Sequence, residues 1–103
     1  MDKLTLIREL LDEGSSPNPL PFKLGDAYFI RTVTYHGTGR VRQIIGEWLV
    51  LEDAAYVADT ERFADAIGKG ALREVEPVGE WIVNTEAITD AFPWKHPLPM
   101  EQK

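Results

Sequence analysis

Residues 28–58 read YFIRTVTYHGTGRVRQIIGEWLVLEDAAYVA. β-Branched and aromatic residues dominate this stretch, and glycine-containing segments at residues 36–39 and 46–47 interrupt it. Such residues favour strands, whereas the glycines permit tight turns or bulges. The stretch therefore predicts three strands of a small, strongly bent β-barrel, which we place at residues 27–36, 40–45 and 48–57.

The third of these strands is apolar on both faces. Leu49 and Leu51 share one face, and Trp48 and Val50 share the other. A strand that is apolar on both sides is normally buried on both sides. We therefore expect both faces of this strand to be covered, and a second copy of the chain would cover one of them.

Shorter segments flank the three strands. Apolar residues at helical spacing predict an N-terminal helix over residues 2–13, and a Pro-rich connector follows over residues 15–22. A short helix is expected over residues 60–67, with Asp59 as its N-cap and Gly68 or Gly70 at its end.

The C-terminal third predicts two more strands, 72–78 and 80–85, on either side of a turn at Gly79. Residues 91–103 form an extended, Pro-rich tail. The chain is thus expected to be a single domain, residues 1–103, with a mainly β, five-stranded barrel over residues 27–90.

Composition narrows the class of protein. A chain of 103 residues forms one domain, and 44% hydrophobic and 27% charged residues are typical of a soluble protein. Cysteine is absent, which excludes disulfides and thiolate metal sites. No segment is long and apolar enough for a membrane span, and we expect a cytoplasmic protein.

Charge is distributed unevenly. Residues 27–46 hold three arginines and no acid, whereas residues 47–90 hold eleven acids against three basic residues. A solvated acidic face explains this pattern, and so does a basic edge that meets the acidic edge of a second copy. The net charge of −6 disfavours phosphate backbones, so nucleic acid is not an expected partner.

The order of these elements resembles the Sm-like, SH3-like family of small β-barrels. The similarity is clearest from Gly39-Arg40-Val41 to Leu49-Val50-Leu51-Glu52-Asp53-Ala54, where a glycine opens the second strand and the third ends in leucines and acids. Residues 83–88, VNTEAI, are similar to a second signature of the family. The resemblance implies rings formed by strand addition between neighbouring subunits.

The positions that bind nucleotides in this family differ here. The family's RNA-binding members have Asp and Asn in the turn before the third strand and a basic residue followed by Gly in the second signature. This chain has Ile45-Gly46-Glu47 and Asn84-Thr85. The chain also resembles small proteins of tailed phages and prophages in its RTVT, TG and LVLEDAA runs. This resemblance implies a phage- or prophage-encoded protein, for which the virion is the alternative location to the cytoplasm.

Residues typical of catalysis or metal binding are sparse. His36 lies beside a glycine turn and His96 lies in the tail, and a structural or solvent-exposed role is expected for each. Glu52, Asp53 and Asp59 lack the ligand spacing of a calcium loop and form an acidic rim. We therefore predict no catalytic residue, no cofactor and no metal.

Three arginines are the candidates for contacting an anion or nucleotide: Arg31, Arg40 and Arg42. Arg40 and Arg42 share a strand face because side chains alternate along a strand. They can hold a phosphate by bidentate contacts, with Tyr35 or His36 stacking nearby. The alternative is that they pair with Glu47, Glu52 or Asp53, in the same chain or the next.

Aromatic residues exceed what so small a core holds, and surplus aromatics mark protein interfaces. The candidate interface residues are Trp48, Tyr56, Trp81, Phe92 and Trp94. Phe92 and Trp94 are expected to insert together on the outside of the barrel near Trp48, Tyr56 or Trp81, in their own subunit or in a neighbour.

The sequence thus predicts a non-enzymatic, self-associating structural or interaction protein. Its partners are further copies of itself and, if it is phage-encoded, another phage or host protein. The alternative is a ring that binds RNA or a small nucleotide through its arginines.

Overall fold

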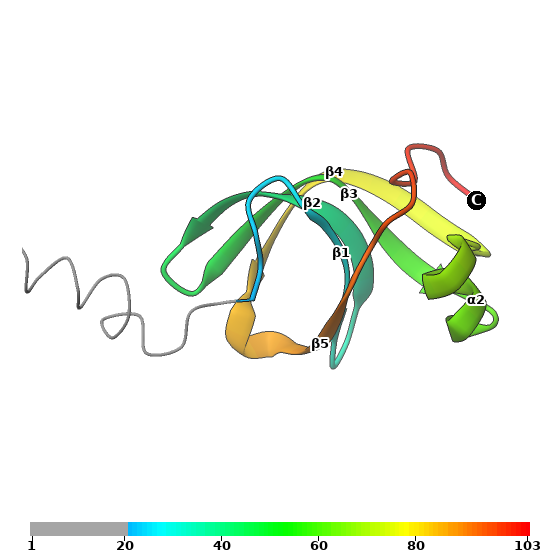
Figure 1. Cartoon of the computed structure of the whole chain (residues 1–103), viewed down its shortest axis with the longest axis horizontal. Coiled ribbons are helices and arrows are strands. Elements are labelled where there is room, and N and C mark those ends of the chain that lie inside the picture. The colour runs from blue at the N-terminus through cyan, green and yellow to red at the C-terminus, as the bar shows by residue number, and fades with distance from the viewer. Residues whose placement is uncertain (1–20) are drawn as a thin grey trace, which may run out of the picture.

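The computed structural model describes residues 21–103 (Figure 1). The helix expected over residues 2–13 and most of the connector lie outside the described residues. The elements, in chain order, are β1 (Ala27–Thr32), β2 (His36–Ile45), β3 (Trp48–Asp59), α2 (Phe63–Lys69), β4 (Glu74–Asn84), the 3₁₀ turn η2 (Thr85–Ala87) and β5 (Ile88–Pro93).

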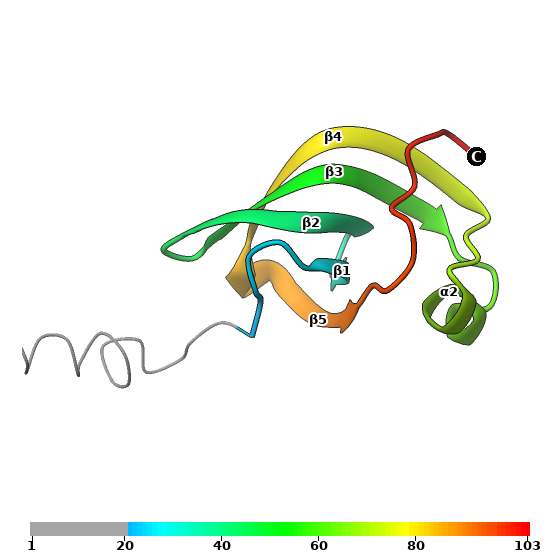
Figure 2. The same ribbon diagram turned by 45° about the horizontal axis from the view of Figure 1, so that its top comes forward.

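The strands form one antiparallel sheet in the order β4-β3-β2-β1-β5. Register shifts interrupt the β2–β3 and β3–β4 ladders, and each extra residue increases the local bend of a strand. The sheet consequently curls, so that β5 lies below the arch of β2, β3 and β4 (Figure 2). The expected mainly β, five-stranded architecture is confirmed.

Two hydrophobic clusters lie on opposite sides of this sheet. The inner cluster fills the curl and consists of Tyr28, Ile30, Val41, Leu49, Leu51, Ala54 and Val83. The outer cluster lies against α2 and the C-terminal segment and consists of Phe29, Ala55, Val57, Ala66, Leu72, Val75 and Trp94. β1 contributes to both, because its successive side chains point to opposite faces.

Both faces of β3 are therefore buried within a single chain. Leu49, Val50 and Leu51 are all buried, and Ala55 and Val57 face the outer cluster. The expectation that both faces are covered holds for the middle of the strand but not for Trp48, which is 47% exposed, or for Tyr56, which is only partly buried. The cover over Ala55 and Val57 is supplied by α2 and the C-terminal segment instead of by a second copy.

The first turn is not where the glycines predicted it. β1 ends at Thr32, whose hydroxyl accepts a hydrogen bond from the backbone N–H of Tyr35 at 2.8 Å, and β2 already begins at His36. Gly37 and Gly39 lie inside β2 with no positive φ, and the β2–β3 ladder shifts register at Gly39, so the bulge expected as the alternative to a turn is present there. A Cβ at Gly39 would approach the Cβ of Leu51 to 2.9 Å, so the glycine permits close packing instead of a turn.

The two strands expected at residues 72–78 and 80–85 are one strand, β4. Gly79 adopts φ 82° within it, opposite Ala54, next to a register shift of the ladder. The glycine therefore bends the strand instead of ending it. The fifth strand is β5, which pairs with β1 and includes Phe92, a residue that the sequence placed in the tail.

The inserted helix lies slightly later than expected, at residues 63–69. Its N-cap position is Arg62, while Asp59 accepts a hydrogen bond from the N–H of Glu61 in the preceding turn. Gly70 ends the helix in the left-handed conformation, with φ 75°. None of the helices among residues 21–103 is long and apolar enough to cross a membrane.

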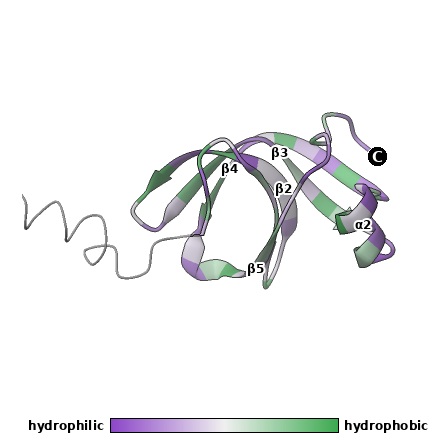
Figure 3. Cartoon of the chain, in the orientation of Figure 1, coloured by the Kyte–Doolittle hydropathy of each residue, from purple (hydrophilic) through white to green (hydrophobic). Residues whose placement is uncertain are grey.

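Some hydrophobic residues lie outside both clusters. Figure 3 shows them at the tip of the β2–β3 hairpin, far from α2, where Ile45 and Trp48 are about half exposed. Val78 and Ile82 on β4 are likewise exposed. Exposed apolar side chains therefore lie on β4 and at the hairpin tip.

Candidate functional site

Each candidate anion-binding arginine pairs with a carboxylate of its own chain. Arg40 Nη1 lies 3.0 Å from Asp53 Oδ2, and Asp53 is one of the partners that the sequence suggests for this arginine. Arg42 Nη2 lies 2.6 Å from Glu80 on β4. The third, Arg31, pairs with Asp90 on β5. The structure therefore disperses the three guanidinium groups over three ion pairs and does not collect them into one anion site.

Arg31 has the most constrained surroundings of the three. Its Nε and Nη2 both donate to the carboxylate of Asp90, at 2.7 and 2.5 Å. Its Cζ lies 4.5 Å from the ring centroid of Phe63 and 5.3 Å from that of Phe92. The hydrogen bonds between these two side chains lower the pKa of Asp90 and raise the pKa of Arg31. This guanidinium joins β1, β5 and α2.

The turn at residues 45–47 and the segment at residues 84–85 lie side by side. The N–H of Thr85 donates to the carbonyl of Glu47 at 2.7 Å, which ties η2 to the β2–β3 turn. Asn84 is the N-cap of η2, and its Oδ1 accepts a hydrogen bond from the N–H of Glu86 at 2.9 Å. The charged side chains at this junction are Glu47 and Glu86, both exposed, so it presents negative charge.

The candidate interface aromatics separate into two groups. Trp94 is only 4% exposed and, with Phe92, packs in the outer cluster on Phe29 and Phe63 of the same chain. These two residues do share one surface, as expected, but it is not the surface near Trp48, Tyr56 or Trp81. The register explains the difference, because β5 places Phe92 directly opposite Phe29.

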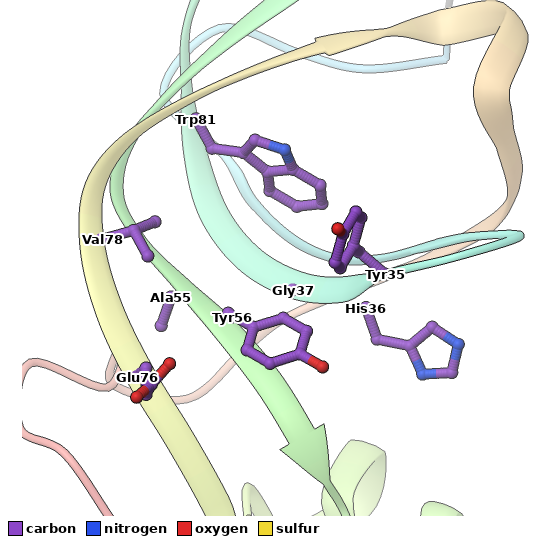
Figure 4. A pocket seen from close by; sticks show the side chains of 8 residues that line it. All are labelled: Tyr35, His36, Gly37, Ala55, Tyr56, Glu76, Val78 and Trp81. Atoms are coloured by element: carbon purple, nitrogen blue, oxygen red, sulfur yellow. The ribbon is translucent and has the colours of Figure 1, made fainter.

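Trp48, Tyr56 and Trp81 remain at least partly accessible. Trp48 lies at the hairpin tip, whereas Tyr56 and Trp81 line a cavity of about 280 Å³ between the β1–β2 turn, β3 and β4 (Figure 4). Tyr35 forms another wall, and we call this cavity the aromatic pocket. No local sequence pattern indicates this pocket, because the pairing that brings Tyr35 beside Tyr56 depends on where β2 begins.

The sheet has two outer strands, β4 and β5, and each pairs with a single neighbour among residues 21–103. Part of the β4 edge is covered, since Val75 and Lys103 exchange two backbone hydrogen bonds, of 2.9 and 3.2 Å. The stretch from residue 76 to residue 84 has no such partner in the described part of the chain. This stretch carries the exposed side chains of Val78 and Ile82.

The histidines have local roles. His96 Nε2 lies 2.7 Å from the carbonyl oxygen of Ile67, and its ring packs on Trp94. His36 lies 6.2 Å, between centroids, from Phe29. Within residues 21–103, no group of three or more His, Asp or Glu side chains is arranged to hold a metal ion.

Comparison with known proteins gives fold neighbours only. No protein-family model and no curated protein matches the chain. A heptameric archaeal Sm protein superposes with a TM-score of 0.50 and 19% identity over 68% of this chain and 87% of that one. The SmAP1 heptamer of P. aerophilum gives a TM-score of 0.51 and 20% identity over 86% and 92% of the respective chains. The fold of this chain is therefore that of the Sm proteins.

Proposed function

We propose that this protein is a non-enzymatic, self-associating structural protein whose subunits join edge to edge, β4 of one copy adding to β5 of the next. The observation that carries the proposal is the pair of open edges at opposite ends of one curled sheet. Unpaired strand edges are templates for strand addition, and edges at both ends allow each subunit to bind two neighbours.

Three further observations support this mode of assembly. Residues 78–84 of β4 contain neither lysine nor proline, two residues that commonly protect exposed edges, whereas Pro77 lies just before them. Val78 and Ile82 on this strand are each 53% exposed. The two Sm structures compared above are heptamers. By contrast, the arginine pattern does not argue for association, because each arginine is paired within its own chain, and the apolar faces of β3 are covered by the same chain except at Trp48 and Tyr56.

The experiment is native mass spectrometry with light scattering at micromolar concentration. We expect a multiple of 11.6 kDa for the wild type. Ile82→Asp should shift the protein toward the monomer, because it adds charge at the β4 edge. The control is Val33→Asp in the β1–β2 turn, where the side chain is 93% exposed and outside the β4 edge. A wild-type particle of 11.6 kDa would refute the proposal.

We further propose that this assembly does not bind RNA at the junction of the two turns. Glu47 and Glu86 repel phosphate there, and the arginines that would attract phosphate are already paired with carboxylates. Fluorescence anisotropy with a labelled uridine oligonucleotide at about 0.15 M salt tests this. Tight binding that Arg40→Ala or Arg42→Ala abolishes would instead establish the alternative, an RNA-binding ring.

The cellular setting follows from the sequence resemblance alone. We propose a phage- or prophage-encoded protein that acts in the cytoplasm or on the virion, with another phage or host protein as a further partner. Co-purification from infected cells or from intact virions distinguishes the two locations.

A further inference from the structure

The aromatic pocket has walls at right angles to one another. Tyr35 and Tyr56 have ring centroids 5.8 Å apart and planes at 78°, and Trp81 lies across the cavity from them (Figure 4). The indole can occupy that place because position 37 is glycine. A Cβ there would lie 2.7 Å from Cζ3 of Trp81. Three electron-rich rings therefore surround one small space from different directions.

The charge around this space is negative. Glu76 is the one lining side chain that carries a charge at neutral pH apart from the titratable His36. Glu76 belongs to no ion pair among residues 21–103, whereas Glu80 on the same strand is paired with Arg42. β4 itself contains three glutamates and no basic residue. An anionic ligand is consequently disfavoured, and a cationic one is favoured.

The lining also selects among cations. Apart from Glu76 and His36, the side chains that line the pocket are apolar or aromatic, with Val78 and Ala55 as the aliphatic part. A bare ammonium or guanidinium group would lose hydrogen bonds to water in such a space. A cation whose charge is covered by methyl groups loses few, and it gains attraction from the ring faces.

We propose that the aromatic pocket is a binding site for an alkylated ammonium cation, such as the trimethylammonium group of choline or of trimethyllysine. Tyr35, Tyr56 and Trp81 contact the methyl groups, and Glu76 balances the charge. The volume of about 280 Å³ is at the small end of the range for ligand pockets, which suits a head group rather than a large molecule. Glu76, Val78 and Trp81 of the lining lie on β4, whose backbone edge the proposed assembly uses, so the pocket borders the assembly edge and is formed by side chains instead of by the backbone groups of that edge.

The test compares choline with 3,3-dimethylbutan-1-ol, which has the same shape but no charge, by NMR titration of the full-length protein. We expect choline to bind about five- to thirty-fold more tightly. Glu76→Gln should weaken choline binding and leave the neutral alcohol unaffected. Equal affinities for the two compounds, or no saturable binding of choline at millimolar concentration, would overturn the proposal.

Two further variants locate the site, and a second ligand distinguishes the sources of the cation. Trp81→Leu should abolish choline binding, whereas the control Trp48→Leu, at the distant hairpin tip, should not change it. If a trimethyllysine peptide binds much more tightly than choline, the source of the cation is a modified protein. If choline binds more tightly than the peptide, the source is a free metabolite. The oligomeric state is measured in parallel, so loss of binding with an intact assembly leaves the proposed function standing.

Discussion

Replacing Trp94 with alanine is expected to destabilise the protein, because it removes the largest side chain of the outer cluster. The indole is 4% exposed, lies against Phe29 with ring centroids 6.1 Å apart, and packs on His96 at 5.0 Å. Truncating a buried Trp to Ala typically costs about 3–5 kcal/mol. The hydrogen bond from Nε1 to the carbonyl of Pro97, at 3.3 Å, is long and adds little.

A loss of this size is a large part of the stability of a small domain, about 5–15 kcal/mol. The melting temperature should fall by at least about 12 °C, since each kcal/mol shifts it by about 4–8 °C in a domain of this size. Urea denaturation followed by circular dichroism, at two protein concentrations, gives the free energy of unfolding. Trp48→Ala is the matched control, because 47% of that residue is exposed and a much smaller loss is expected.

Two results would refute the placement of Trp94 in its own subunit. One is a loss no larger than that of the control. The other is a loss that appears only where the wild-type protein is assembled and disappears on dilution, because a side chain buried in a neighbour stabilises the assembly and not the single chain.

Three other substitutions test particular contacts. The guanidinium of Arg31 lowers the pKa of Asp90, so the wild type should lose stability as pH falls below the ordinary carboxyl pKa of 3.8. Asp90→Asn should flatten that part of the pH profile of the melting temperature. Gly37→Ala should lower the free energy of unfolding, measured by urea denaturation, by about 1–3 kcal/mol, because the added Cβ would meet Trp81. The control is Gly68→Ala, which has open space around its Cβ and should be neutral or stabilising. Thr38→Val should be neutral or stabilising by about 1 kcal/mol, because the Thr38 hydroxyl is fully buried without a hydrogen-bond partner among residues 21–103; a marked loss of stability would contradict this.

The strand content could be predicted from the sequence, because alternation and β-branched residues report local preferences directly. The strand ends could not, because glycine has more than one use. The sequence predicts a turn or a bulge at Gly37 and Gly39, and the ladder does shift register at Gly39. The two glycines also accommodate Trp81 and Leu51, which come from β4 and β3. Gly79 was interpreted as a chain reversal and instead bends one continuous strand.

Long-range pairings explain the remaining differences at the candidate site. The partners of Arg31 and Arg42 lie 59 and 38 residues away in the sequence, so no local pattern identifies them. Arg40 pairs only 13 residues away, across the β2–β3 hairpin, and this was the pairing that the sequence did suggest. The aromatic pocket was missed for the same reason, since it requires the positions of β2, β3 and β4 together.

The pairing of β1 with β5 also has a consequence for how the chain folds. The first strand of the sheet needs the last as its neighbour, and Phe29 is covered by residues such as Phe92 and Trp94 that are synthesised much later. Topologies dominated by such distant contacts fold slowly, in about milliseconds to seconds, because a long loop closes before any contact stabilises it. On the ribosome, β1 to β4 emerge before the segment that covers their outer cluster. A nascent chain halted before residue 88 is therefore expected to expose Phe29 and to aggregate instead of forming a smaller barrel.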